Sequence, residues 1–271
     1  MTIALKNGLR RYGAMAAVTP KMFMAYSIWV WMEFFVQMIF VVIYVAFWRA
    51  VFASTETVGG LTLDQTLNYI LLAQLIGNAS MNTDKLYDFG VGLREGQIAA
   101  ALLRPLDYQG GMYVQNVAHI GLNLVLQAPL ALFIWLVYGL QLPSEPLIWL
   151  AFAVTMVLGY TVMFCFDWII GCVAFYSTEV WGLSVARFGL ALFFSGALIP
   201  LNMMPDWLRT IASILPFSQA VYLPVSLLSG ITPLSAMPRI WLMQVVALVG
   251  LLALSRIMFR RALRVITVQG G

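Results

Sequence analysis

Residues 147–175 read LIWLAFAVTMVLGYTVMFCFDWIIGCVAF, and Asp167 is their only charged residue. A transmembrane helix needs roughly 20 consecutive, mainly apolar residues, so this stretch is predicted to cross a bilayer. Similar stretches lie on both sides of it, and they predict further spans at about 28–52, 66–83, 112–138, 181–200 and 239–259. The expected fold class is therefore an all-α, polytopic membrane protein with six transmembrane helices.

The stretch 205–230 is also apolar, but Pro205, Pro216, Pro224 and Gly230 interrupt it. Each half is too short to cross a bilayer, and backbone breaks at membrane depth are tolerated only where protein or a water-filled cavity covers them. We expect two short helices that dip back from one surface, within an outer re-entrant region at 201–232. A seventh span is the alternative.

The composition supports a lipid-embedded chain. Of the 271 residues, 62% are hydrophobic and 10% are charged, whereas soluble globular domains carry about 25% charged residues. So few charges cannot cover a water-facing surface, which excludes a soluble protein. One domain of six spans with short loops accounts for residues 1–271. Cys165 and Cys172 lie within one apolar stretch and are interpreted as packing residues.

Lysines and arginines predict the orientation, because cytoplasmic loops carry an excess of them. Of the 15 basic residues, all but Arg49, Arg209 and Arg239 flank inner ends of spans when the N-terminus is placed inside. Both termini are therefore predicted to be cytoplasmic. The net charge of +4 follows from this asymmetry, and no nucleic-acid partner is expected.

Two segments outside the spans have distinct patterns. Residues 1–24 place Leu5, Leu9, Tyr12 and Met15 at helical spacing, with basic residues elsewhere. They predict a helix that lies in the headgroup layer, and a short solvated leader is the alternative. Residues 84–111 form the longest predicted cytoplasmic connection, which is large enough for a structured contact with a partner.

Three charges fall inside predicted spans, and they are Glu33, Asp167 and Arg187. A charge at the bilayer centre costs roughly 2.5–3.5 kcal/mol on insertion scales, so it usually faces protein or water and finds a partner. All three are predicted in the cytoplasmic third of their spans, where Arg187 can pair with either acid. They form either a charged vestibule or gate, or a packing ion pair.

Polar side chains, mostly amides, recur every four residues in two spans. Residues four apart share a helix face, and amides cannot face lipid cheaply. The stripes therefore either hydrogen-bond between helices or line a wet translocation path. The candidates are Gln74, Asn78 and Asn82 in the second span and Gln115, His119, Asn123 and Gln127 in the third.

The sequence lacks motifs of self-contained catalysis. It contains no G-x-x-x-x-G-K-[ST] phosphate loop, so the chain cannot hydrolyse ATP by that route. The single histidine excludes a two-histidine metal site, and no G-x-S-x-G turn occurs. We predict no catalytic, cofactor-binding or metal-binding residue.

Two stretches resemble motifs of a known family. Residues 94–106, REGQIAAALLRPL, are similar to the pattern R-x-G-x-[ILV]-x-x-x-L-L-R-P-L. Residues 195–209, SGALIPLNMMPDWLR, and the LPF that follows at 215–217 are similar to G-x-x-x-P-x-x-x-x-P-x-W-L…L-P-[FY]. Together with the basic amphipathic start and the six-span plan, they resemble the permeases of type-2 ABC transporters, the ABC-2 exporter family.

The resemblance implies a permease subunit without its own ATPase, in a bacterial cytoplasmic (inner) membrane. Two ABC ATPase subunits would carry the ATP and Mg²⁺, and a second permease, identical or a paralogue, would complete the path through the lipid. The exported substrate would be amphipathic or hydrophobic. The alternative is an ion-coupled secondary transporter or channel, with Glu33, Asp167 and His119 as its relay.

The resemblance also implies roles for residues. A cytoplasmic coupling helix at about 90–103 would contact the ATPase, and Pro105 would end it. The re-entrant region would close the outer end of the path. The implied coupling residues are Arg94, Glu95, Gln97, Ile98, Leu102, Leu103 and Arg104, and those of the re-entrant region are Pro200, Pro205, Trp207 and Pro216.

Overall fold

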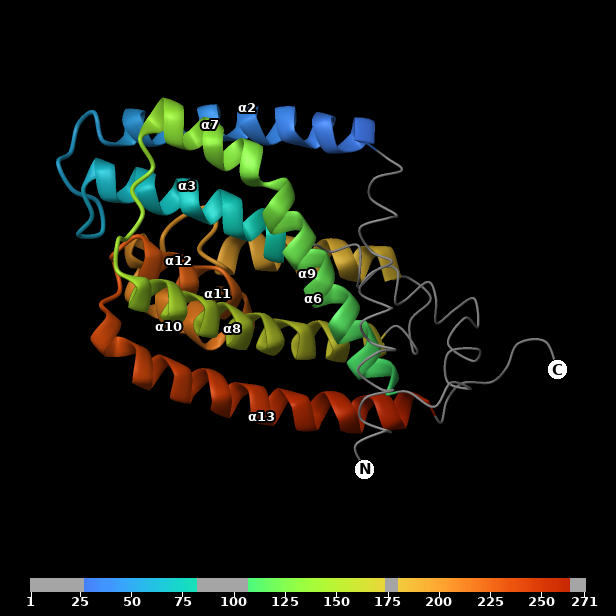
Figure 1. The fold of residues 1–271 in the computed structure, drawn as a ribbon. Coiled ribbons are helices and arrows are strands. Elements are labelled where there is room, and N and C mark those ends of the chain that lie inside the picture. The colour runs from blue at the N-terminus through green and yellow to red at the C-terminus, as the bar shows by residue number, and fades with distance from the viewer. Residues whose placement is uncertain (1–26, 82–106, 174–179, 264–271) are drawn as a thin grey trace.

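The computed structural model describes residues 27–81, 107–173 and 180–263. Within these ranges the chain is helical, without a β-strand (Figure 1). The predicted headgroup helix at 1–24, the coupling helix at 90–103 and Asn82 lie outside the described residues. The elements are α2 (Ser27–Val51), α3 (Leu63–Ser80), α6 (Tyr108–Leu126), α7 (Ala128–Tyr138), α8 (Pro146–Val173), α9 (Val180–Phe194), the 3-10 turn η1 (Leu201–Met203), α10 (Asp206–Ile214), α11 (Pro216–Ala220), α12 (Tyr222–Leu228), the 3-10 turn η2 (Leu234–Ala236) and α13 (Met237–Ala262).

Four helical stretches of the described chain are long and apolar enough to cross a membrane. They are Trp31–Val51, Tyr108–Tyr138, Pro146–Val173 and Leu234–Ala262. A pair of helices, Asp206–Ile214 and Pro216–Leu228, bends by 72° and counts as a fifth only if it is one span. The chain is thus a multi-pass membrane protein. The total of six spans stays a prediction, because α3 contains several polar amides and α9 has only 15 residues.

Large apolar side chains cover the outside of the bundle. Ile28 in α2, Leu136 in α7 and Leu242 in α13 are each at least 65% exposed. A water-soluble protein does not expose apolar surface on this scale, whereas lipid tails accept it. These surfaces indicate that acyl chains surround α2, α7 and α13.

The helices α2, α3, α8 and α13 lie along roughly one direction, and α6 crosses them obliquely, so the helix ends gather at two opposite ends of the bundle (Figure 1). One end holds the starts of α2, α6 and α9 and the ends of α3, α8 and α13. The opposite end holds the loops at 52–62 and 139–145. We call these the first end and the second end.

Helix α8 is the packing centre, and it contacts α11, α12 and α13. The sequence explains this position, because Ala151, Thr155 and Gly159 recur every four residues and are all buried. Small residues on one helix face let neighbouring backbones approach closely in lipid. A Cβ atom on Gly159 would lie only 1.9 Å from the carbonyl oxygen of Gln219 in α11.

Prolines and a glycine shape the interrupted segments. Gln127 ends α6, and Pro129 lies in the first turn of α7, where its missing N–H costs no helical hydrogen bond. Pro216 is likewise the first residue of α11. Gly196 adopts φ 83°, and its carbonyl accepts a 2.9 Å hydrogen bond from the hydroxyl of Tyr69 in α3. This bond fixes the chain between α9 and η1 against the core.

The region from 201 to 232 contains more pieces than the two short helices predicted. The structure has η1 and α10, and then α11 and α12 separated at Val221, whose φ of −122° and ψ of −61° are not helical. The break at Pro216 is where the sequence predicts it. Both α11 and α12 are buried against α8, which provides the protein cover that broken backbone needs in a membrane.

Candidate functional site

The predicted coupling loop is 84–111, but α6 already begins at Tyr108 within it. The rest of the loop lies in the stretch between two described residues, Met81 and Asp107, and includes Arg94, Glu95, Gln97, Ile98, Leu102, Leu103 and Arg104, which lie outside the described ranges. An arginine–aspartate ion pair contacts each of the two boundary residues. We call them the α8–α9 pair and the α6–α13 pair.

The α8–α9 pair joins Asp167 of α8 to Arg187 of α9. The guanidinium donates through Nε at 2.8 Å and through Nη2 at 2.5 Å to the two carboxylate oxygens. Its third nitrogen, Nη1, donates at 3.4 Å to the carbonyl of Met81, at the C-terminal end of α3. The Arg187 side chain is only 2% exposed. A cation suits this place, because the last carbonyls of a helix lack partners and carry partial negative charge.

The α6–α13 pair joins Asp107, the N-cap of α6, to Arg256 of α13. Two hydrogen bonds of 2.5 and 2.6 Å run from the guanidinium to the carboxylate, and the carboxylate also accepts from the Gly110 amide at 3.0 Å. The hydrogen bond and charge of Arg256 lower the pKa of Asp107, although partial burial opposes them. The acid is therefore held ionised at the start of α6.

Neighbouring contacts reinforce the second boundary. The amide of Gln109 donates at 2.9 Å to the hydroxyl of Ser255 in α13. Tyr108 stacks on Phe259 with centroids 6.0 Å apart, and Trp168 of α8 meets the same ring at 5.1 Å. These aromatic contacts add to the ion pair, so α6 begins in a fixed position on α8 and α13.

Both pairs lie at the first end of the bundle, since they join the end of α3, the start of α6 and adjacent turns of α8, α9 and α13 (Figure 1). The chain enters and leaves the segment 82–106 through residues that are tied to packed helices. Bidentate pairs restrict both distance and orientation, so these pairs hold α8 to α9 and the start of α6 to α13.

The other intramembrane charge is placed differently. Glu33 lies on the exposed side of α2, where its carboxylate accepts a 3.0 Å hydrogen bond from Gln37. Of the two acids that the sequence leaves open as partners of Arg187, the structure places Asp167 beside it. Glu33 is on a helix that packs mainly against α3 and α7.

The two polar stripes belong to helices that pack against each other, α3 and α6. In α3, Gln74 is half-buried and Asn78 is exposed. In α6, His119 is buried, whereas Gln115, Asn123 and Gln127 are half-buried. Gln127 also marks the break between α6 and α7. The stripes therefore run partly inside the bundle and partly on its surface.

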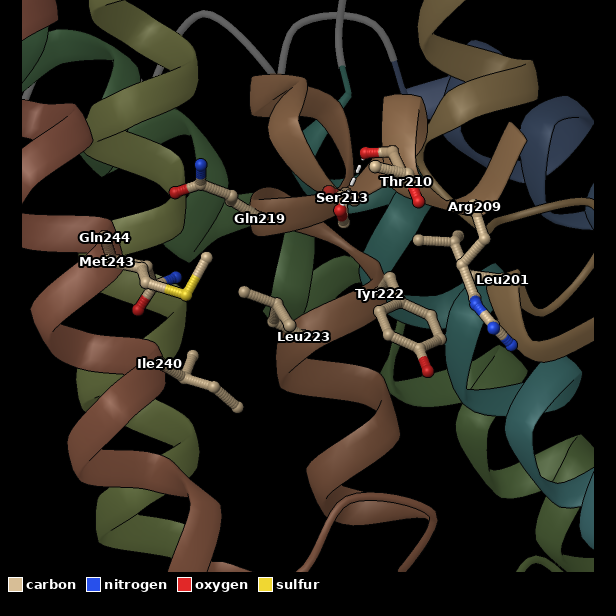
Figure 2. Close-up of a pocket in the computed structure, with 11 residues that line it drawn as sticks. Leu201, Arg209, Thr210, Ser213, Gln219, Tyr222, Leu223, Ile240, Met243 and Gln244 are labelled. Atoms are coloured by element: carbon tan, nitrogen blue, oxygen red, sulfur yellow. Dashed lines mark hydrogen bonds between the residues drawn. The ribbon is translucent and has the colours of Figure 1, made fainter. Parts of the chain in front are cut away.

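The residues of the predicted re-entrant region divide between core and surface. Pro200 and Pro216 are buried, whereas Pro205 and Trp207 are exposed, Trp207 by 67%. A cavity of about 310 Å³ lies beside them, between α10, α11, α12 and α13 (Figure 2).

Sequence reasoning missed several residues that the structure brings together. The α6–α13 pair links positions 149 residues apart, and no local pattern predicts such a partner. A local signal for Asp107 did exist, because aspartate just before an apolar helix is a common N-cap. Thr155 was missed too, although it accepts from Trp241 Nε1 at 2.9 Å and its carbonyl accepts from Gln244 at 3.2 Å.

The comparisons with known proteins agree with the architecture. No curated protein matches the chain. The family model described as ABC-2 family transporter protein matches residues 22–270, which is nearly the whole chain and includes both ion pairs and the cavity beside α10–α13. The chain therefore belongs to the ABC-2 family of transporter proteins.

Proposed function

We propose that this chain is the permease subunit of an ATP-driven ABC exporter and forms half of its translocation path. The observation that carries the proposal is that two bidentate ion pairs contact the boundary residues. Arg187, paired with Asp167, donates one 3.4 Å hydrogen bond to the Met81 carbonyl, and Arg256 pairs with Asp107 itself. They tie both boundaries of the segment 82–106 to the packed helices. The family implies an ABC ATPase partner, and the sequence has no phosphate loop of its own.

In this proposal, six spans cross a bacterial cytoplasmic membrane and both termini are cytoplasmic. The coupling helix at 90–103 docks on an ATPase through Arg94, Glu95, Gln97 and Arg104, with Ile98, Leu102 and Leu103 in its groove. Two ATPases carry the ATP and Mg²⁺, and a second permease completes the path.

The work of transport comes from differential binding. ATP can shift the permease between two conformations only if the ATP-bound partner favours one of them. The two ion pairs make this shift possible, because they convert a movement of the segment 82–106 into a movement of α8, α9 and α13. An amphipathic or hydrophobic substrate then passes between the two permeases, along the stripes that contain Gln74, His119 and Asn123.

Co-purification tests the proposal. An affinity-tagged chain is extracted from its native membrane, and bound subunits are identified by mass spectrometry while ATP hydrolysis is measured. We expect a nucleotide-binding subunit and ATPase activity with the wild-type chain, and loss of both with Arg94→Glu/Arg104→Glu. Arg239→Glu is the matched control, because Arg239 is an exposed arginine at the start of α13, and it should retain both.

Two results would contradict the proposal. One is a wild-type complex without any nucleotide-binding subunit. The other is transport by the purified chain alone, driven by an ion gradient in proteoliposomes, which would favour the ion-coupled alternative. A double variant that keeps its ATPase would remove only the coupling assignment to Arg94 and Arg104.

A further inference from the structure

The cavity beside the re-entrant helices has the size of a small ligand site. Its volume is about 310 Å³, within the range of roughly 300–1,000 Å³ that such pockets occupy. It is partly open, and all the residues that line it come from one chain, in η1, α10, α11, α12 and α13 (Figure 2). A ligand could therefore be tested on the isolated chain.

One part of the wall is apolar. Leu223 of α12 and Ile240 and Met243 of α13 point toward one another across the cavity, and Leu201 of η1 lies on the other side, near Tyr222 and Arg209 (Figure 2). A flexible methionine and branched aliphatic side chains suit an alkyl chain or another apolar body. The remaining wall is polar, so the cavity fits a ligand with two unlike parts.

Most hydroxyl groups of the polar wall have already used their donors. The hydroxyls of Thr210, Ser213 and Ser218 donate to backbone carbonyls at 2.8, 2.8 and 3.1 Å. Tyr222 donates to the side-chain oxygen of Asn202 at 2.5 Å. A hydroxyl whose hydrogen is engaged can still accept, so this wall offers a ligand acceptors rather than donors.

Two glutamine side chains of the same wall each have an acceptor oxygen without a hydrogen bond to any described residue. Gln219 and Gln244 are 7% and 1% exposed, and neither side-chain oxygen has a hydrogen-bond partner in the described structure. The nitrogen of Gln244 is engaged with the carbonyl of Thr155. Neighbouring atoms cover both oxygens in the described conformation. A ligand would reach the oxygen of Gln219 only after its amide rotates about the broad terminal torsion, and the same rotation of Gln244 would give up its bond to Thr155. Unpaired buried acceptors are costly to keep, and a ligand donor would relieve that cost.

The charge of the rim limits the head group. Arg209 lines the side of the cavity away from Gln219 and Gln244 (Figure 2), and its charge is paired with the exposed Asp206. The two glutamines are neutral, and no carboxylate is among the described residues that line the cavity to hold a protonated amine. The lining therefore favours a neutral donor.

We propose that this cavity is a ligand site for an amphipathic small molecule whose uncharged, hydroxyl-bearing head group donates hydrogen bonds to Gln219 and Gln244. Its apolar part lies against Leu223, Ile240 and Met243. The assignment of this ligand as cargo rests on the proposed function, but its binding does not, because all the residues that line the cavity belong to one chain.

Photoaffinity labelling of the isolated chain in nanodiscs tests the site. The probe is 1-monodecanoylglycerol with a diazirine in its acyl chain, and labelled peptides are identified by mass spectrometry. We expect saturable labelling of peptides that contain Leu223, Ile240 or Met243. Unlabelled 1-monodecanoylglycerol should compete, whereas methyl decanoate, which has no hydrogen-bond donor, should compete poorly.

Variants separate the head-group contact from general apolar binding. Gln219→Leu and Gln244→Leu should each lower the affinity of the cavity for 1-monodecanoylglycerol by about fivefold, the effect of losing one ordinary hydrogen bond. The affinity for methyl decanoate should stay the same. Gln141→Leu, in an exposed loop at the second end, is the control and should leave both affinities unchanged. Gln219 makes no hydrogen bond through its oxygen, so Gln219→Leu keeps the test valid if Gln244→Leu fails to fold.

Three results would overturn the site. They are labelling that does not saturate, equal competition by methyl decanoate, and unchanged affinity in both glutamine variants. Stronger competition by decanoyl phosphate would assign the cavity to an anionic head group at Arg209 and would also refute the neutral one. The labelling experiment contains no ATPase, so a negative labelling result would not contradict the permease proposal. Likewise, absence of an ATPase from the co-purified complex would not contradict the ligand site.

Discussion

At the scale of single residues, Arg187 is the charge that the fold can least replace. Its side chain is 2% exposed and serves both Asp167 and the end of α3. Removing one partner of a buried pair leaves the other charge without compensation. We predict that Arg187→Met lowers the free energy of unfolding by about 3 kcal/mol, measured as a lower melting temperature in nanodiscs.

The double variant Asp167→Leu/Arg187→Met should recover much of this loss, because an apolar pair of similar volume is often tolerated in place of a buried ion pair. Arg209→Met is the matched control, since Arg209 pairs with an aspartate whose side chain is 90% exposed. Such surface pairs contribute little, and the melting temperature should not change. A single Arg187→Met variant as stable as wild type would contradict the role of the α8–α9 pair.

At this scale the sequence predicted that charges inside spans need partners, and the burial of Arg187 follows that rule. It could not choose between Glu33 and Asp167, because the choice depends on which helices are neighbours. It also could not find Arg256 as the partner of Asp107, since a pair separated by 149 residues leaves no periodic trace.

At the scale of the elements, the contact between α8 and α11 depends on Gly159. A Cβ atom there would lie 1.9 Å from the carbonyl oxygen and 2.6 Å from the carbonyl carbon of Gln219, which are backbone atoms of a buried helix. We predict that Gly159→Ala separates α11 from α8 and destabilises the protein by at least about 1–3 kcal/mol, the usual cost of overpacking. Thermal melting in nanodiscs measures this.

Gly189→Ala provides the comparison, because it is also a glycine inside a helix but a Cβ atom there meets nothing within 4 Å. It should leave the melting temperature unchanged or raise it, since alanine favours helix over glycine by about 1 kcal/mol. If Gly159→Ala behaved like Gly189→Ala, the close approach of the two backbones would be refuted.

The sequence predicted the long apolar helices better than the interrupted ones. The runs at 28–52 and 147–175 correspond to α2 and α8, because twenty or more apolar residues have few alternatives to a helix. The separation of α6 from α7 was not predicted, although Pro129 marks it. The second break, at Val221, lies just before Pro224, which is in the first turn of α12. Because proline has no N–H to donate to the carbonyl four residues earlier, the sequence did carry a local signal for this break, and packing against α8 accompanies it.

At the scale of the whole molecule, the orientation decides whether an ATPase can reach the segment 82–106. A variant with Cys165→Ala and Cys172→Ala receives one new cysteine, either Ser54→Cys or Gly92→Cys. We predict that a membrane-impermeant maleimide labels Ser54→Cys in intact cells and labels Gly92→Cys only after permeabilisation. The reason is that Ser54 lies in the loop at the second end, opposite the end that holds the two ion pairs.

Labelling of Gly92→Cys in intact cells would place the first end outside and would rule out a cytoplasmic ATPase there. Of the candidate site, the sequence predicted the coupling segment through its motif and the re-entrant region through its prolines. It did not predict the cavity, because Gln219 and Gln244 are 25 positions apart in different elements and only folding places them on one wall.

The distance along the chain between Asp107 and Arg256 has a consequence for biosynthesis. A ribosome adds about 5–20 residues per second, and Arg256 follows Asp107 by 149 positions. On the order of ten seconds of synthesis therefore pass at this rate before the ion pair at the start of α6 can form. Until α13 has been inserted, Asp107 lacks its ion pair with Arg256, so one boundary of the segment 82–106 is not held in place. A partner that recognises the segment with both boundaries held would therefore bind only to fully synthesised chains.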